Sequence, residues 1–181
     1  MKTMKQFGLA LSFSVMAMLS SCSSSGGDDN GGGFSGPATG SFVKATANGT
    51  NVLAEGQFAT GGYESGNLVM QGMTMDGKSV NIQLYALDGT IDVGTYNVSS
   101  TNTEDNYIGS LLYMEVNTST FTTASFSSQI CDNASGTIEV TFVDATKIEG
   151  TFSFTGKELK ENDDCSCVTR SVTNGSFRLE L

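Results

Sequence analysis

Apolar and polar residues alternate along most of this chain, and the alternation limits the possible folds more than any other feature. The segment 78–87 shows it best, because polar side chains separate Val80, Ile82 and Leu84. A period of two places successive side chains on opposite faces of a β-strand. After residue 41, no segment carries the i, i+3, i+4 apolar stripe of an amphipathic helix. The sequence therefore predicts an all-β fold.

Short turn signals separate the alternating segments. Asp76-Gly77 and Asn48-Gly49 each lie between two of them, and such dipeptides favour the type I′ turn, whose two central residues have positive φ. Strands are predicted at 41–47, 51–55, 68–75, 78–87, 94–98, 107–116, 121–127, 137–143, 148–154 and 176–181.

About nine or ten short strands joined by polar turns are typical of an antiparallel β-sandwich or a flattened β-barrel, and we favour the sandwich. A barrel that encloses a lumen would imply a ligand. The alternation also predicts which side chains point inward. They are Ile108, Leu112, Met114 and Val116, then Ile138, Val140 and Phe142, then Ile148, Phe152 and Phe154, and finally Phe177, Leu179 and Leu181, with Arg178 and Glu180 facing water.

The first 22 residues are organised like a lipoprotein signal. Lys2 and Lys5 precede an apolar run over residues 7–19 that is too short to span a bilayer. Leu19-Ser20-Ser21-Cys22 resembles the bacterial lipobox, in which the Cys thiol receives a diacylglycerol. We expect residues 1–21 to be a signal peptide and Cys22 to be the lipidated first residue of the mature chain. The alternative is an ordinary secretory signal.

Residues 22–41 are predicted to form a flexible linker, because Ser and Gly dominate them. The remainder, 42–181, is expected to be a single β domain. Asp28-Asp29 resembles the short acidic signal that sends some Bacteroidetes lipoproteins to the outer face of the outer membrane, although a solvated charge pair is an equal alternative. We expect an outer-membrane protein at the cell surface or the periplasmic face.

Acidic residues dominate the charge of the mature chain. Without the signal, seven Lys and Arg remain against nineteen Asp and Glu, which leaves a net charge of −12. Nucleic acid is excluded as a partner, because binding it draws on Lys and Arg contacts to phosphate. The lipid is therefore the expected contact with the membrane, and we expect a monomer.

Three cysteines remain once Cys22 is acylated. Cys131 precedes the hairpin predicted from 137 to 154, and Cys165 and Cys167 follow it, so all three emerge at one end. We expect a disulfide from Cys131 to one of the other two, with the third free. The sequence does not choose between them, and a strained Cys165–Cys167 bridge and a thiolate metal site are the alternatives.

An acidic segment near the C-terminus carries Glu158, Glu161, Asp163 and Asp164. Carboxylates of this kind are ligands that Ca²⁺ prefers. Their spacing matches no ligand-loop signature, so we favour a solvated loop and expect neither a metal nor a cofactor.

Catalysis is not expected. The chain contains no His, which excludes Ser-His-Asp and Cys-His sites. Four tyrosines are candidates for a sugar-binding face, although we favour their packing against a second sheet; they are Tyr63, Tyr85, Tyr107 and Tyr113.

Three stretches follow one another along the chain after the lipobox. The first is 41–49 (SFVKATANG). The second, 76–96, contains Asp76-Gly77-Lys78 and Gly94-Thr95-Tyr96, and the third is 150–156 (GTFSFTG) followed by 173–177 (TNGSF). Together they resemble a family of small, uncharacterised Bacteroidetes lipoproteins built on a β-rich domain of unknown function. The chain departs from the family at Val52-Leu53, where members often carry Trp. The resemblance implies a surface or periplasmic β domain and no activity.

These features favour an outer-membrane-anchored lipoprotein that acts as a binding or interaction module for a glycan or a protein. Two alternatives stay open. One is a structural or adhesive surface component without a small ligand, and the other is a lipocalin-like carrier.

Replacing Cys22 tests the anchor directly. Cys22→Ala removes the only thiol at the expected cleavage site, so labelled fatty acid should no longer be incorporated and the protein should be uncut or released. Mass spectrometry of an unmodified mature N-terminus at another position in the natural protein would contradict the lipobox.

Overall fold

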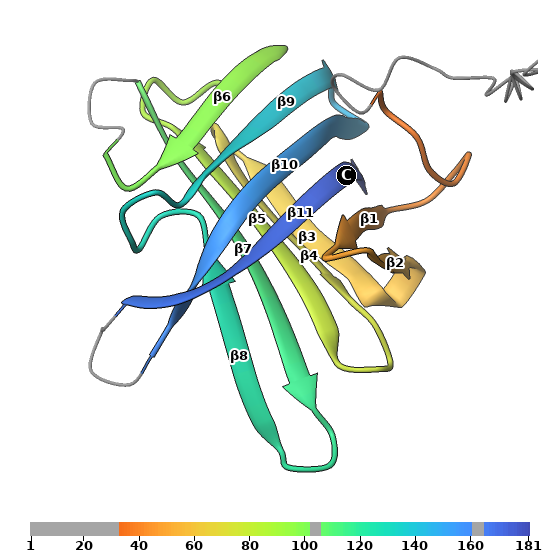
Figure 1. Cartoon of the computed structure of the whole chain (residues 1–181). Helices are drawn as coiled ribbons and strands as arrows, with labels where there is room; N and C mark the ends of the chain where they lie inside the picture. The colour runs from red at the N-terminus through yellow and green to blue at the C-terminus, as the bar shows by residue number, and fades with distance from the viewer. Residues whose placement is uncertain (1–32, 102–105, 161–164) are drawn as a thin grey trace, which may run out of the picture.

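The computed structural model of the protein describes residues 33–101, 106–160 and 165–181, which fold into an all-β domain (Figure 1). All strand pairs are antiparallel, as the alternation predicted. The strands within these ranges are β1 (Phe42–Ala47), β2 (Thr50–Glu55), β3 (Ala59–Glu64), β4 (Asn67–Met73), β5 (Lys78–Ala86), β6 (Gly94–Ser99), β7 (Tyr107–Asn117), β8 (Thr122–Ser127), β9 (Ser135–Val143), β10 (Lys147–Leu159) and β11 (Cys165–Glu180), with a 3-10 turn, η1 (Gly56–Phe58), after β2.

The strands form a nearly closed barrel rather than the favoured sandwich. Their order is β2-β1-β11-β10-β8-β7-β5-β4-β3, and β9 and β6 are added beside the first part of β10. β3 and β4, at one end of this path, lie against β1 and β2 at the other. The long strands explain the closure, because β10 pairs with β9 along its first part and with β8 at Lys157 and Glu158.

The two predicted turns differ in type. Asn48 and Gly49 have φ of 46° and 80° and connect the pair Ala47↔Thr50, so the type I′ prediction is confirmed. The Asp76-Gly77 hairpin is confirmed in place but not in type, since only Gly77 has a positive φ. Thr74 explains the difference: its Oγ1 accepts a hydrogen bond from the Lys78 amide (3.1 Å), which favours a longer loop.

Strand β3 is the element that the sequence did not predict. Its core is Thr60-Gly61-Gly62-Tyr63, which lacks alternating apolar residues. A Cβ at Gly61 would lie 2.3 Å from the Val69 carbonyl oxygen of β4, so the close pairing of these strands requires glycine there.

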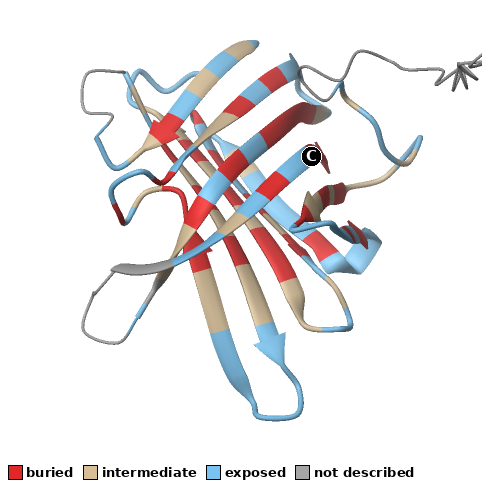
Figure 2. Cartoon of the chain, in the orientation of Figure 1, coloured by how far each residue is buried: buried red, intermediate tan, exposed pale blue. Residues whose placement is uncertain are grey.

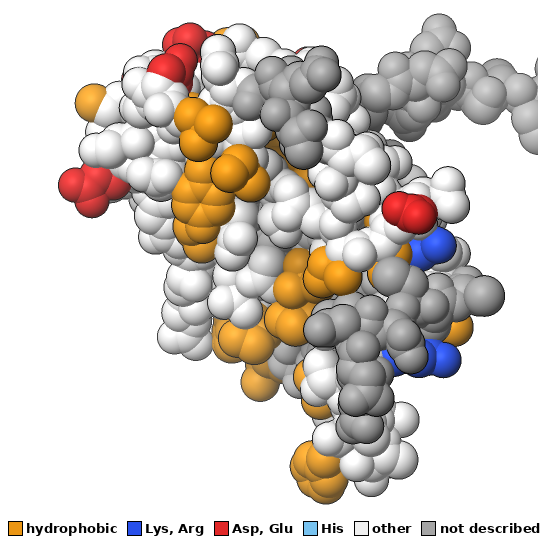
Figure 3. Space-filling model, turned by 90° about the vertical axis from the view of Figure 1, so that its left-hand side faces the viewer, with side chains coloured by type: hydrophobic (Ala, Val, Ile, Leu, Met, Phe, Trp, Pro, Cys, Tyr) orange, Lys and Arg blue, Asp and Glu red, His pale blue; other side chains and the backbone are white. Residues whose placement is uncertain are grey.

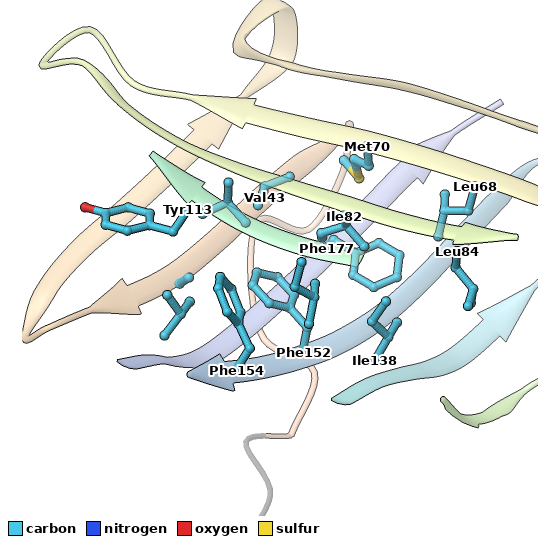
Figure 4. Packing of buried hydrophobic residues seen from close by; sticks show 14 of the residues in the cluster. Val43, Leu68, Met70, Ile82, Leu84, Tyr113, Ile138, Phe152, Phe154 and Phe177 are labelled. Atoms are coloured by element: carbon cyan, nitrogen blue, oxygen red, sulfur yellow. The ribbon is translucent and has the colours of Figure 1, made fainter. Parts of the chain in front are cut away.

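Buried residues alternate with more exposed ones along the strands (Figure 2), and their apolar side chains pack together in the barrel interior (Figure 4). Val80, Ile82 and Leu84 are fully buried, as predicted. Figure 4 shows the phenylalanine rings of β10 and β11 pointing into the interior, toward side chains such as Ile82 and Leu84 of β5. A lipocalin-like carrier needs an apolar lumen, and this packing does not support that hypothesis.

Two phenylalanines and two glycines interlock β10 with β11. Gly150 pairs with Phe177, and Phe152 pairs with Gly175. A Cβ on either glycine would lie 2.7 Å from ring atoms of the opposite phenylalanine. Each ring therefore lies over the glycine of the neighbouring strand, and the two ring centroids are 6.5 Å apart.

The face of strand β7 that points into the barrel is the opposite of the one predicted. Leu111 and Tyr113 are buried, whereas Ile108 is 53% exposed and Val116 is exposed as well. Both faces of this strand are apolar, so alternation alone left its orientation ambiguous.

Two other inward predictions are wrong. Phe142 is exposed because the β9–β10 register shifts between Glu149 and Gly150, which leaves an extra residue in β9 and reverses the alternation beyond Val140. Leu181 is also exposed, since it follows the last residue of β11.

Residues 33–41, which the sequence assigned to the linker, lie against the outer side of β1 and β11. We call this segment the strap. The Ser35 amide donates to Ser176 Oγ (3.2 Å), and the Gly40 amide donates to Glu180 Oε1 (2.7 Å). Phe34 packs against Phe42 with ring centroids 5.8 Å apart. An aromatic side chain in a Gly-rich segment is what lets it bury apolar surface.

The strap buries Arg178, which the sequence placed in water. Arg178 is only 7% exposed; its Nη1 donates to the Pro37 carbonyl (2.8 Å) and its Nε to Glu149 Oε1 (2.5 Å). Burial raises the pKa of Glu149, but hydrogen bonds from Lys147 and Arg178 outweigh it, so the net pKa is lowered. The carboxylate stays charged beneath the strap.

Adding one methyl group at Gly150 tests the interlock. Gly150→Ala forces a Cβ against the Phe177 ring and against the Glu139 carbonyl oxygen of β9, so urea unfolding should show a loss of about 2 kcal/mol or more, as overpacking of a core does. Gly94→Ala is the matched control, because nothing lies within 4 Å of its Cβ position. Equal stability of the two variants would contradict the interlock.

Candidate functional site

The barrel core ends in a layer of charged side chains at one end, which we call the mouth layer: Lys78, Glu115, Glu158 and Arg170. Each lies two residues beyond an inward-facing position, namely Val80, Tyr113, Gly156 and Val172. The period of two therefore directs all four toward the barrel axis. Lys78 pairs directly with Glu115, and Arg170 pairs with Gly156. Sequence reasoning missed this layer, because Glu158 and Arg170 lie outside the predicted strands and Glu115 was on the face of 107–116 predicted to point outward.

A two-pronged ion pair organises the mouth layer. Arg170 Nε lies 3.1 Å from Glu115 Oε1, and Arg170 Nη2 lies 3.3 Å from Glu115 Oε2. The guanidinium carbon also lies 4.6 Å from the centroid of the Phe126 ring, so Arg170 covers the end of the core. The hydrogen bond from Arg170 is the main cause that lowers the pKa of Glu115, and burial only partly opposes it.

Tyr113 connects this ion pair to the core. It is 1% exposed, and burial is the main cause that raises the pKa of its hydroxyl, with the Glu115 charge and hydrogen bond adding to the effect. The hydroxyl therefore stays protonated and donates to the Glu115 carboxylate. Glu115 is held by Arg170 on one side and Tyr113 on the other.

A hollow of about 550 Å³ lies beside the mouth layer. Part of its lining comes from the β7–β8 hairpin, which projects from the barrel in Figure 1. Asp76 and Lys78, which form an ion pair, line one side, and the hairpin provides hydroxyl and amide groups. The lining consists of Asp76, Lys78, Glu115, Val116, Asn117, Thr122, Thr123, Ala124 and Glu158. Such a mixture of acceptors and donors suits a hydrophilic ligand rather than an apolar one.

The opposite end of the barrel is closed by tyrosines. Tyr96 and Tyr107 meet edge to face with centroids 4.9 Å apart. The Tyr96 hydroxyl donates to the Asp92 carbonyl (2.7 Å), and the Asn97 amide donates to the Tyr107 hydroxyl (2.8 Å). The Tyr96 hydroxyl holds the β5–β6 connection in place and the Tyr107 hydroxyl holds β6, so both have a structural role.

The four tyrosines proposed for a sugar-binding face do not share one. Tyr63 and Tyr107 pack against the core at the tyrosine end, and Tyr113 is buried at the mouth. Tyr85 is half-buried on the outer side of β5, opposite Ile108.

Cys131 is buried and disulfide-bonded. The backbone of Cys165 pairs with Leu159 at the start of β11. The side chains of Cys165 and Cys167 lie outside the described part of the structure, so the partner of Cys131 stays a prediction.

Of the four acidic residues considered for Ca²⁺, Glu158 lines the hollow at the mouth, and Glu161, Asp163 and Asp164 lie outside the described residues. Within the described ranges, no group of three or more His, Cys, Asp or Glu side chains is arranged to hold a metal ion. These ranges also contain no helix with the length and hydropathy of a transmembrane span.

A family model described as a domain of unknown function, DUF6252, matches residues 40–178. The chain belongs to the DUF6252 family. No curated protein and no solved structure matches the chain. The predicted resemblance is confirmed as far as a domain of unknown function, whereas Bacteroidetes origin and lipoprotein status stay predictions. The DUF6252 match spans the Gly150–Phe177 interlock and all four residues of the mouth layer.

The stability of the DUF6252 barrel should depend on Glu115 in a defined pH window. Since Arg170 lowers the pKa of Glu115 below its ordinary value of 4.5, the ion pair contributes fully above about pH 4.5 and is lost as the pH falls through the lowered pKa. Glu115→Gln should cost about 1 kcal/mol at pH 7, and the difference from the natural protein should shrink as the pH falls through the lowered pKa of Glu115. Urea titrations at several pH values measure this.

The control is Glu64→Gln, which neutralises an exposed carboxylate at the end of β3, outside the mouth layer, and should unfold like the natural protein at every pH. A Glu115→Gln difference that stays constant over the whole acid range in which the natural protein loses stability would contradict the ion-pair account.

Proposed function

We propose that this DUF6252 protein is a monomeric, lipid-anchored binding module of the bacterial outer membrane, whose ligand occupies the hollow at the barrel mouth. The lipobox at Cys22 supports the anchor. The mouth layer supports the site, because inward-facing charges are costly unless they are paired or used, and here they border an open hollow.

The position of the strap favours a mouth that points away from the membrane. The strap is bonded to Ser176 and Glu180, at the C-terminal end of β11, whereas Arg170 of the mouth layer lies nearer its beginning. At about 3.3 Å per strand residue, Arg170 and Arg178 are separated by roughly 26 Å. Eleven residues of chain from Cys22 to Gly33 reach at most about 40 Å. Because the tether enters the domain at the strap, we propose that the strap end is the end nearer the lipid.

The chemistry of the hollow favours a hydroxyl-rich or zwitterionic ligand, such as the end of a glycan or a peptide. Carboxylates of Asp76 and Glu158 accept hydrogen bonds, and the Lys78 ammonium donates them. We infer binding rather than catalysis. The competing explanation is that the mouth layer only seals the core against water.

Filling the hollow tests the proposal. Thr122→Arg places a long side chain among the lining residues without removing any ion pair. The full lipoprotein, purified in detergent, is screened against glycan and peptide arrays, and affinities are measured for every ligand retained. We expect at least one saturable ligand whose affinity falls tenfold or more in Thr122→Arg.

Thr95→Arg is the matched control, since Thr95 is an exposed strand residue on β6, outside the hollow. It should bind like the natural protein. Absence of any saturable ligand, or equal binding by the Thr122→Arg and natural proteins, would leave the seal as the only role of the mouth.

A further inference from the structure

The outer side of five adjacent strands, β3, β4, β5, β7 and β8, is nearly uncharged. Among their outward positions, all within the described ranges, the one charged residue is Glu64, at the β3–β4 turn. The chain as a whole has a formal net charge of −10. Figure 3 shows another side of the molecule, where hydrophobic and uncharged polar side chains also cover wide areas between scattered charges. Because this face offers almost no charged group to pair with a charged ligand, it suits an uncharged one.

Amides and apolar groups alternate across the centre of this face. Gln71, Asn81 and Leu112 lie side by side in register on β4, β5 and β7. In the next row, Val69 lies beside Gln83. We call this surface the amide face, and it comprises Val69, Gln71, Asn81, Gln83, Ile108 and Leu112. Val69 and Ile108 are exposed, whereas the others are half-buried.

One donor on the amide face has no partner. Asn81 Nδ2 is buried, and within the described structure no acceptor reaches it. An unsatisfied buried donor costs about 1–3 kcal/mol. Because this nitrogen is buried, a ligand oxygen would bond it only after the Asn81 side chain turns outward, and that bond would remove the cost. The amide at the centre of the face therefore favours a ligand rich in acceptors.

A protein partner or a second copy fits the amide face poorly. Five strands about 4.8 Å apart, followed over about seven residues each, cover roughly 500 Å², below the roughly 800 Å² that each partner buries in a standard interface. The chain contains no Trp, and the face carries no Arg, so two of the three residue types that usually anchor protein interfaces are missing.

We propose that the amide face binds the chain of an uncharged polysaccharide. Asn and Gln amides both donate and accept hydrogen bonds, which matches sugar hydroxyls that do the same. Val69, Ile108 and Leu112 contact the apolar C–H surface of the sugar rings. This site is separate from the hollow at the mouth and does not depend on the function proposed for it.

Affinity electrophoresis of the full lipoprotein tests the proposal, with soluble glycogen, xyloglucan, galactomannan or dextran in the gel and alginate as the charged comparison. At least one neutral polysaccharide should retard the natural protein. Gln83→Glu keeps the size of the side chain but adds a charge to the amide face, so retardation should weaken at least tenfold. Gln57→Glu, an exposed amide in η1 outside the face, is the matched control and should leave it unchanged.

Thr122→Arg separates this proposal from the one for the mouth, because it fills the hollow and should leave retardation unchanged. Urea midpoints of the variants establish that each is folded. Three outcomes would overturn the proposal: no retardation by any of the four neutral polysaccharides, equal retardation of the Gln83→Glu and natural proteins, or stronger retardation by alginate. If the natural protein were a dimer and Gln83→Glu a monomer, the amide face would bind a second copy of the chain rather than a polysaccharide.

Discussion

The structure depends on the two phenylalanine rings that each lie over a glycine of the neighbouring strand. Gly150 and Phe177 form one pair, and Phe152 and Gly175 form the other, so neither β10 nor β11 can shift without exposing a ring or forcing a clash. These are the two longest strands in the described structure. Because β10 also pairs with β8 and β9, and β11 with β1, the interlock sets the register on which barrel closure depends.

The same hairpin carries both ends of the proposed function. Toward the C-terminus of β11, Arg178 joins the strap to Glu149 beneath it. Toward the start of β11, Arg170 joins Glu115 over the last ring of the core. The Arg178–Glu149 pair is buried and the Arg170–Glu115 pair is partly exposed. Neither is expected to add much net stability, because desolvation offsets the attraction in a buried pair and solvent screens an exposed one. Here the two ion pairs fix positions. One fixes where the strap meets the barrel, and the other fixes where the core ends and the hollow begins.

What could be predicted was local. Alternation identified ten of the strands and the buried residues of β5, and Asn48-Gly49 gave its turn type, because each depends only on neighbouring residues. β3 was missed because its glycines leave no alternation of apolar and polar residues. The inward face of β7 was predicted wrongly because both of its faces are apolar. Arg178 was placed in water because its burial depends on Pro37 of the strap, 141 residues earlier in the chain. The mouth layer required four strands to be placed together, which period and propensity do not do.

The central claim is that the lipid anchor and the mouth lie at opposite ends of one rigid hairpin. The chain contains no Trp, so a single Trp introduced at Ala38 in the strap or at Thr120 in the β7–β8 connection is a unique fluorescent donor. Energy transfer from each to dansyl-labelled lipid headgroups, measured on the lipoprotein in vesicles, compares their distances from the membrane. We expect clearly greater transfer from position 38. Equal transfer, or greater transfer from position 120, would contradict a mouth that faces away from the membrane.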